Sequence, residues 1–486
     1  MTTFLIGIII LIVGGYFYGA YCEKVFGPDD RETPAVTKAD GVDFVAMKKW
    51  KNSLIELLNI AGTGPIFGPI QGILFGPIAF ITIPLGCVLA GSMHDYFSGM
   101  ISMRNGGAQM PRLIKKYMGN NVIKFYNVVL WILMFLVGVV FVYTPGDLIV
   151  TQVLGQEAAV TNSVTWIVYA AIFAYYLIAT LFPIDAIIGR VYPIFGAFLI
   201  ISAVGIFAGV LMDGGANLTN LSFASNPFTM HPKGLPFVPV FFITVACGIM
   251  SGFHATQATL ISRTVKTEKE GKTTFFNMMI VEGFIAMCWA AGAMVLFGRG
   301  TDVATGATAV VGMVAKEFLG SVGGMIAIIG VIVLPITSGD TAFRSLRLMV
   351  SEQFNINQQP AKSRILVSAA LFIPAMIVLY YAKSSPEGFN ILWRYFAFTN
   401  QFVATFALAT ISVYLYIHGK NYMVSLIPGV FYFFVTLSFI FNAQIGLRLP
   451  WSIAYILAAI CSVGYVWFVR KRASSQKDQI IQNVLS

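Results

Sequence analysis

Charged side chains are scarce in this sequence. Only 11% of the 486 residues are Asp, Glu, Lys or Arg, whereas 57% are hydrophobic, a balance far from that of an average soluble domain. Apolar stretches of ~20 residues are long enough to cross a bilayer, and thirteen of them follow one another along the chain. The longest polar connections, Glu23 to Asn52 and Arg299 to Gly320, are too short to form a domain with its own core. The composition predicts a polytopic membrane protein and argues against a soluble one.

Cysteine and histidine are also few, and neither type clusters. The five cysteines lie singly within predicted spans, without a Cys-x-x-Cys pair, so neither a disulfide framework nor a zinc site is indicated. The four histidines show no His-Glu-x-x-His or comparable spacing. We expect no metal site and no cofactor. The sequence also lacks a nucleophile paired with a base, which argues against an enzyme.

The expected spans divide the chain into six parts. We place the spans at 3–22, 53–75, 77–103, 121–145, 161–182, 190–212, 236–261, 273–298, 321–343, 363–382, 391–417, 422–441 and 450–470. The six parts are an additional N-terminal helix at 1–22, a cytoplasmic loop at 23–52, a first five-helix unit at 53–212, a second at 236–417, two C-terminal helices at 422–470 and a cytoplasmic tail at 471–486.

The net charge of +10 follows the membrane topology. If the chain starts outside and crosses thirteen times, 25 of the 31 Lys and Arg residues fall on inside segments and five on outside segments, with Arg394 near or within a span. An excess of Lys and Arg marks the cytoplasmic side. We therefore predict an external N-terminus and a cytoplasmic C-terminus, and no role in binding nucleic acid.

The second span contains an unusual density of helix breakers. In "NIAGTGPIFGPIQGILFGP", Asn59 to Pro77, Gly or Pro occupies nearly every second position. Pro65 has no N–H for the carbonyl of Ala61, and it biases the residue before it away from helical angles. Because irregular backbone is tolerated in a bilayer only where it lines a cavity or is buried in protein, a break at Gly62 to Pro65 is a candidate site. The alternative is a ridge for close helix packing alone, made by Gly64, Gly68, Gly72 and Gly76.

A second interruption lies in the seventh span. The segment "VACGIMSGFHATQATL" places small and polar residues, from Gly248 to Gln257, inside an apolar stretch. Spans two and seven are five apart, and the charge count makes them start from opposite sides. Two five-helix units in opposite orientation, each opening with a discontinuous helix, form the LeuT-like plan of one large class of secondary transporters. We predict an all-α fold of about thirteen transmembrane helices with this 5+5 inverted repeat.

The two breaks supply a candidate solute site. A half-helix that begins at Pro65 directs its positive end at the middle of the membrane, where it suits a carboxylate. The residues predicted to bind the solute are Ala61, Gly62, Thr63, Gly64, Pro65, Gly248, Ser251, Gly252, Phe253 and His254.

A cation site is predicted beside the solute site. Freed carbonyls at the first break suit a small cation, together with oxygens of "PITSGDTAFRSLRLM" in the ninth span. The predicted ion ligands are Ala61, Gly62, Thr337, Ser338, Asp340 and Thr341. The alternative for Asp340 is an ion pair with Arg344, one turn further along the helix.

Other polar residues within the spans have two interpretations each. His94, Asp95 and Glu282 could relay a proton, because an ionisable group at membrane depth is costly and marks function by default. Each could instead be a hydrogen-bonded strut between helices. We expect Glu56, close to three lysines, to be an interfacial charge, and Asn400 with its neighbour Gln401 to join helices by hydrogen bonds.

Four blocks, in order, carry a family resemblance. "NIAGTGPIFGPIQG", "LAGSMHDYFSGMISMRNGG", "ITVACGIMSGFHA" and "TNQFVATFALAT" together resemble the carbon starvation protein A family of bacterial inner-membrane transporters, from about Trp50 to past Thr410. The chain looks like a shorter branch of that family. Longer members carry a His-His pair just before the IAG block, where this chain has Ile55 and Glu56, which weakens the transfer of substrate identity.

The resemblance implies a function. Members of this family belong to the broad amino acid, polyamine and organocation (APC) class and take up peptides or, in some cases, pyruvate during nutrient limitation. We therefore expect a symporter that imports a small carboxylate-bearing solute, a peptide or amino acid, with sodium or a proton as coupling ion. Pyruvate or another monocarboxylate is the alternative substrate. A passive channel or a membrane-embedded enzyme is the alternative of another class.

Overall fold

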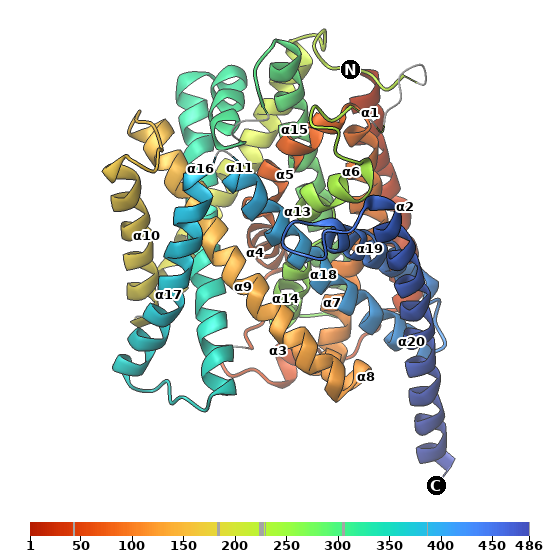
Figure 1. Cartoon of the computed structure of the whole chain (residues 1–486). Coiled ribbons are helices and arrows are strands. Elements are labelled where there is room, and N and C mark those ends of the chain that lie inside the picture. Colours follow the sequence, from red (N-terminus) through yellow and green to blue (C-terminus); the bar gives the residue numbers. More distant parts are fainter. Residues whose placement is uncertain are drawn as a thin grey trace.

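The structure is a computed structural model, and it describes residues 1–485 apart from 42–43, 182–184, 223–227, 229, 304–306 and 386. The described residues form helices and no strand. Most helices run lengthwise through the molecule, and the two termini lie at opposite ends (Figure 1).

Two discontinuous paths occupy the centre. The first consists of α4 (Lys49–Ala61), α5 (Gly64–Gly72) and a 3-10 turn, η2 (Ile73–Phe75). The second consists of a π-helical turn, η5 (Phe237–Phe241), followed by α12 (Phe242–Thr244), α13 (Ala246–Ile249) and α14 (Gly252–Ile261). Because α5 packs on α13 while α4 packs on α14, the two paths run antiparallel (Figure 1).

Continuous helical segments surround this centre. The N-terminal half contributes α1 (Thr2–Ile9), η1 (Ile10–Gly14), α2 (Gly15–Phe26), α3 (Pro34–Thr37), α6 (Ala79–Gly86), η3 (Cys87–Gly91), α7 (Ser92–Arg104), α8 (Met110–Met118), α9 (Asn120–Leu148), η4 (Ile149–Val153), α10 (Ser163–Leu181) and α11 (Asp185–Met212). The C-terminal half contributes η6 (Glu268–Glu270), η7 (Lys272–Phe276), α15 (Asn277–Gly298), α16 (Ala307–Gln353), α17 (Ala361–Ser384), α18 (Gly388–Ile417), α19 (Met423–Asn442) and α20 (Trp451–Leu485).

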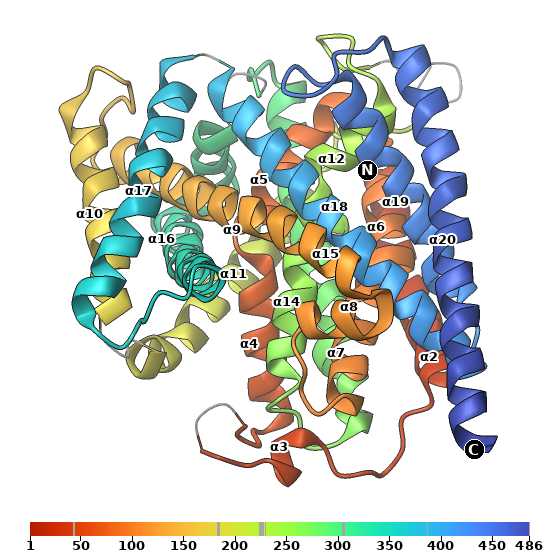
Figure 2. The ribbon, with the colours of Figure 1, turned by 60° about the horizontal axis from the view of Figure 1, so that its bottom comes forward.

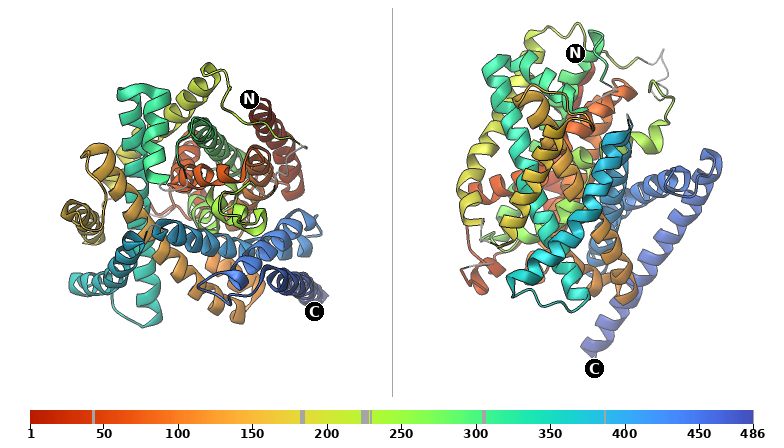
Figure 3. Two further views of the ribbon diagram at one scale, coloured as in Figure 1. Left: turned by 45° about the horizontal axis from the view of Figure 1, so that its top comes forward. Right: turned by 60° about the vertical axis from the view of Figure 1, so that its left-hand side comes forward.

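The long helices α9 and α18 frame the centre. They cross the molecule obliquely side by side (Figure 2), and α9 also packs along α16. By contrast α20 lies at the edge, and its C-terminal part projects beyond the other helices (Figure 3). Ile456, Ile460 and Val463 of α20 are exposed, as expected of side chains that face lipid.

The α16 helix corrects one expectation. The sequence predicts a polar connection from Arg299 to Gly320, yet residues 307–319 form the first part of α16 and bury Val310, Val311 and Val314. Gly320, with a φ of +68°, interrupts the helix, a conformation that favours glycine. Residues 307–319 are too few to cross a membrane, which is why the sequence does not predict a span here. One face of this segment is nevertheless apolar enough to pack against its neighbours.

The number of spans stays a prediction. Within the described ranges, nine helical segments are long and apolar enough to cross a membrane. The broken second and seventh spans are not among these nine, because each half is too short. The segment from α6 to α7 and the α10 helix also fail to meet the requirements of length and apolar character together. Helices nevertheless occupy every region in which the sequence predicts a span.

Candidate functional site

The first break lies where the sequence predicts it. The α4 helix ends at Ala61 and α5 begins at Gly64. Between them Gly62 has a φ of +41° and a ψ of −131°, which glycine adopts far more readily than other residues. Pro65 falls in the first turn of α5, where a helix has no use for its missing N–H. The break is confirmed, and the local chemistry of glycine and proline explains it.

The second break is confirmed as well. The α13 helix ends at Ile249, and Ser251 is extended, with φ −136° and ψ 132°, before α14 begins at Gly252. Asn400 of α18 holds this segment, because its Oδ1 accepts hydrogen bonds from the Ser251 hydroxyl at 3.0 Å and the Phe253 N–H at 2.9 Å. One amide side chain thus pairs with two donors of the interrupted helix.

The two breaks lie directly against each other. A Cβ added at Gly64 would lie only 2.2 Å from the Cβ of Cys247. One added at Gly248 would lie 3.4 Å from the Cγ of Pro69 and 3.7 Å from the Cα of Pro65. The α5 and α13 helices can approach this closely because Gly64 has no side chain.

The predicted glycine ridge is present in part. A Cβ at Gly68 would lie 2.8 Å from the carbonyl oxygen of Thr244, and one at Gly72 would lie 2.6 Å from Cγ1 of Val245. Gly76 does not continue the ridge, because it follows η2 with a φ of +87°. The packing interpretation therefore holds for Gly64, Gly68 and Gly72, and it does not compete with a site at the break.

A cavity opens between the two breaks, α9 and α18. It is lined by Asn59, Ile60, Ala61, Gly62, Gly64, Val137, Phe141, Cys247, Ser251, Phe253, His254, Phe396 and Asn400. Six of the ten predicted solute residues are in this lining, namely Ala61, Gly62, Gly64, Ser251, Phe253 and His254.

The other four predicted solute residues lie behind the cavity wall. Pro65 and Gly248 pack against each other, and Gly252 abuts the backbone of α18, where an added Cβ would lie 2.6 Å from the Asn400 carbonyl oxygen. Thr63 is fully buried, and its hydroxyl has no hydrogen-bond partner among the described residues.

A cluster of ionisable side chains adjoins the cavity. Nδ1 of His254 lies 3.2 Å from Oδ2 of Asp95 and 3.8 Å from Oε2 of Glu282. Oδ1 of Asp95 lies 2.8 Å from Nδ1 of His94. All four side chains are buried, and they come from α7, α14 and α15. The sequence predicts His94, Asp95 and Glu282 as separate relay candidates, and the structure brings them together with His254, which also lines the cavity.

Glu56 is the residue that the sequence interpretation missed. The prediction of an interfacial charge is wrong, because Glu56 is fully buried and both of its carboxylate oxygens lack a hydrogen-bond partner in the described part of the chain. It lies close enough to Asp95 and Glu282 to interact electrostatically. Helical spacing was the available signal, since Asn52, Glu56 and Ile60 share one buried face of α4.

The predicted ion ligands of α16 lie away from the cavity. The hydroxyl of Thr337 donates to the carbonyl of Leu334 at 2.9 Å, and that of Thr341 to the carbonyl of Thr337 at 3.3 Å. Oδ2 of Asp340 lies 3.2 Å from Nη2 of Arg344, so the alternative ion pair is present. None of the four predicted ligands of α16, Thr337, Ser338, Asp340 and Thr341, is in the described lining of the cavity.

Phe141 of α9 fills the space between the first break and α16. A Cβ added at Gly62 would lie 3.3 Å from the tip of its ring, and one added at Gly339 would lie 3.1 Å from its Cβ. Of the predicted ion ligands, only Ala61 and Gly62 line the cavity. The shared cation site therefore stays a prediction, and its two halves do not meet in this structure.

Asn400 and Gln401 join helices as predicted. Besides holding the second break, Asn400 directs its Nδ2 at Sγ of Cys247 at 3.0 Å. Nε2 of Gln401 donates to the carbonyl of Phe242 at 2.9 Å. In the ranges that the structure describes, no group of three or more His, Cys, Asp or Glu side chains could hold a metal ion.

Comparisons with known proteins place this chain in a family. The model of the family described as "Carbon starvation protein CstA" matches residues 1–209, 139–310 and 289–439. An "Uncharacterized membrane protein" of Haemophilus influenzae is 42% identical over 60% of this chain and 89% of its own length. The peptide transporter CstA of Helicobacter pylori is 23% identical over 97% of this chain and 85% of its own length.

Two further similarities concern transporters. The pyruvate/proton symporter BtsT of Escherichia coli is 25% identical over 59% of this chain and 48% of its own length. Among solved structures, a manganese transporter of Eremococcus coleocola shares the fold, with a TM-score of 0.54 and 11% identity over 91% of this chain and 99% of that one. The named relatives are transporters and not enzymes. The chain therefore belongs to the carbon starvation protein CstA family.

Proposed function

We propose that this protein is a proton-coupled secondary transporter that imports a small carboxylate-bearing solute, an amino acid or short peptide, by alternating access. The observation that carries the proposal is the position of His254. Its ring lines the cavity between the two breaks, while its Nδ1 faces the carboxylates of Asp95 and Glu282. One residue therefore adjoins both the solute and the proton-holding cluster.

This position couples the two ligands electrostatically. An anionic solute beside His254 favours the protonated ring, and the protonated ring favours an anion, so each increases the affinity for the other by the same factor. The N-termini of α5 and α14 lie at the cavity. They add positive partial charge where the carboxylate would lie. A proton suits this site better than sodium, because the titratable cluster of His254, Asp95 and Glu282 adjoins the cavity, whereas the predicted ion ligands of α16 are absent from its described lining.

The proposed transport cycle relies on a 5+5 inverted repeat of 53–212 and 236–417. The antiparallel packing of the two discontinuous paths supports this plan, as does the fold shared with a solved transporter. In such folds one unit rocks against the other around a site at their interface. The solute site at the two breaks would then face each side of the inner membrane in turn.

The test is uptake into proteoliposomes along an inward proton gradient. With alanine, glycylglycine and pyruvate as labelled solutes, we expect His254→Gln to lower proton-driven uptake of the transported solute by about tenfold or more. His418→Gln is the matched control, because His418 lies at the end of α18, where its ring bonds the Tyr414 carbonyl. The proposal fails if His254→Gln accumulates solute like the parent protein, or if a sodium gradient alone drives uptake.

Pyruvate or another monocarboxylate is the second candidate substrate. A relative is named a pyruvate/proton symporter. Competition decides between the candidates: excess unlabelled pyruvate should abolish alanine or glycylglycine uptake only if the three share one site.

A further inference from the structure

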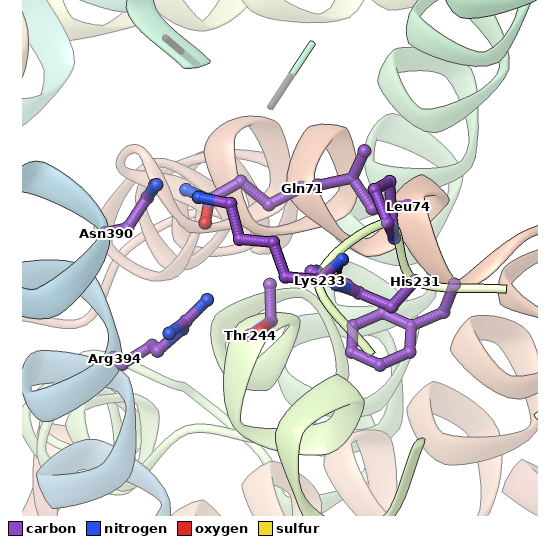
Figure 4. Close-up of a pocket in the computed structure, with 9 residues that line it drawn as sticks. Gln71, Leu74, His231, Lys233, Thr244, Asn390 and Arg394 are labelled. Carbon is purple, nitrogen blue, oxygen red and sulfur yellow. Dashed lines mark hydrogen bonds between the residues drawn. The ribbon is translucent and has the colours of Figure 1, made fainter. Parts of the chain in front are cut away.

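A second pocket lies beyond the end of α5, apart from the cavity at the breaks. It has a volume of about 400 Å³, and three separate parts of the chain build it. Gln71 comes from α5, His231 and Lys233 come from the connection between α11 and η5, and Asn390 with Arg394 comes from α18. Figure 4 shows these side chains converging on one space, with Thr244 of α12 at its base.

Two buried donors in this pocket have no partner among the residues that the structure describes. Gln71 is only 7% exposed, yet its Nε2 makes no hydrogen bond to any described residue. The same holds for the buried Nε of Arg394. Because an unpaired buried donor costs about 1–3 kcal/mol, a pocket that aims two such donors inward is suited to an acceptor from outside the chain.

The charge of the pocket points to an anion. Arg394 and Lys233 bring positive charge, and Glu387 at the rim pairs with Lys233, so one positive charge remains. Burial and the positive charges of Arg394 and Lys233 lower the pKa of His231 to about 4, and His231 is therefore neutral near pH 7. Its Nδ1 accepts the Lys233 N–H at 3.1 Å, which leaves the ring proton on Nε2 as a further donor.

One layer of side chains separates this pocket from the cavity at the breaks. The carbonyl of Thr244 accepts a hydrogen bond from Nε1 of Trp393 at 3.0 Å. The Trp393 ring packs on Phe396, which lines the inner cavity, with centroids 5.4 Å apart, and on Phe67 at 6.0 Å. An anion held in the pocket would lie directly outside this aromatic layer.

We propose that this pocket is a second binding site, which holds the carboxylate of a small organic anion between Arg394, Gln71 and Asn390 on the outer side of the protein. A planar guanidinium and amide N–H groups are the donors that suit a carboxylate. The site is distinct from the one in the proposed function, and its occupancy can be measured without transport.

The experiment measures the rate at which a cysteine in the pocket is labelled. Pro232→Cys, at an exposed lining position outside the three proposed donors, is introduced with Cys461→Ser, because Cys461 is the one exposed native cysteine among the described residues. The full-length protein in lipid nanodiscs reacts with an anionic or a cationic methanethiosulfonate of similar size. Each rate is divided by the rate of the same reagent with free cysteine. We expect a preference of about tenfold for the anionic reagent, and slower labelling in acetate or pyruvate than in chloride at equal ionic strength.

Two arginine variants complete the experiment. Arg394→Gln should abolish both the anionic preference and the protection by carboxylates. Arg448→Gln should preserve both, because Arg448 bonds its own loop at the Gln444 carbonyl and is absent from the pocket lining. Equal normalised rates for the two reagents, or an unchanged preference in Arg394→Gln, would overturn the proposal. Protection by nanodiscs rich in phosphatidylglycerol, with none by acetate or pyruvate, would also overturn it, since a lipid phosphate would then be the ligand.

Discussion

At the scale of single residues, Asn400 of α18 pairs with the interrupted segment of the second break. Its Oδ1 accepts from both the Ser251 hydroxyl and the Phe253 N–H, and the residue is 1% exposed. Water has little access to either donor. The amide oxygen therefore satisfies two donors that would otherwise be buried without a partner.

Truncation of Asn400 tests this dependence. We expect Asn400→Ala to lower the free energy of unfolding by about 1–3 kcal/mol, because two buried donors lose their acceptor. Ser251→Ala removes one donor together with its need for a partner, so its cost should be below about 1 kcal/mol. Thermal unfolding of the purified variants, followed by fluorescence, measures the difference. Equal losses for the two variants would contradict the assignment.

Among the elements, α5 packs closely against α12 and α13 at the site. Gly64 faces Cys247, Gly68 faces the carbonyl of Thr244, and Gly72 faces Val245. Without side chains at these positions, the two discontinuous paths can bring their broken ends together. Gly62 permits irregular backbone before α5, whereas Gly64, Gly68 and Gly72 permit close packing along the helix itself.

A Cβ at the contact should separate the two helices. We expect Gly64→Ala to destabilise the protein by about 1–3 kcal/mol through overpacking, since its Cβ would lie 2.2 Å from that of Cys247. The matched control is Gly464→Ala in α20, where an added Cβ meets nothing within 4 Å; this variant should be neutral or more stable by up to about 1 kcal/mol.

A compensating substitution makes the explanation specific. Cys247→Gly removes the atom that a Cβ at residue 64 would meet, so the double variant should recover part of the melting temperature that Gly64→Ala loses. If the double variant loses the sum of the two single losses, the contact between Gly64 and Cys247 is not the cause.

At the scale of the whole molecule, the predicted topology places most of the basic residues on one side of the membrane. The termini lie at opposite ends (Figure 1), as an odd number of crossings requires. With 25 of 31 Lys and Arg residues on segments predicted to be cytoplasmic, the C-terminal end of α20 should lie inside the cell and the connection between α19 and α20 outside.

Labelling of intact cells tests this orientation. In a Cys461→Ser background, a membrane-impermeant thiol reagent should label Gln444→Cys, in the connection after α19, without permeabilisation. Lys477→Cys, near the end of α20, should be labelled only after the membrane is permeabilised. Both positions are exposed, so access across the membrane is the difference between them. The opposite pattern would invert the predicted topology.

The sequence alone determined the local features of this protein. Helix breakers act within a few residues, so "GTGP" and "IMSGF" were sufficient to locate both breaks, and apolar length was sufficient to indicate a membrane protein. The resemblance carried by four sequence blocks was sufficient to indicate the family. None of these inferences depends on which helix lies beside which.

Tertiary structure decided the features that depend on residues from distant parts of the chain lying side by side. It moved Glu56 from an expected interface to the buried cluster near Asp95 and Glu282, because the rotation of α4 is fixed by its neighbours and not by the lysines before it. It placed Phe141 between α16 and the first break. The outer pocket likewise unites α5, a distant connection and α18. Only packing brings such residues together, because no local pattern relates them.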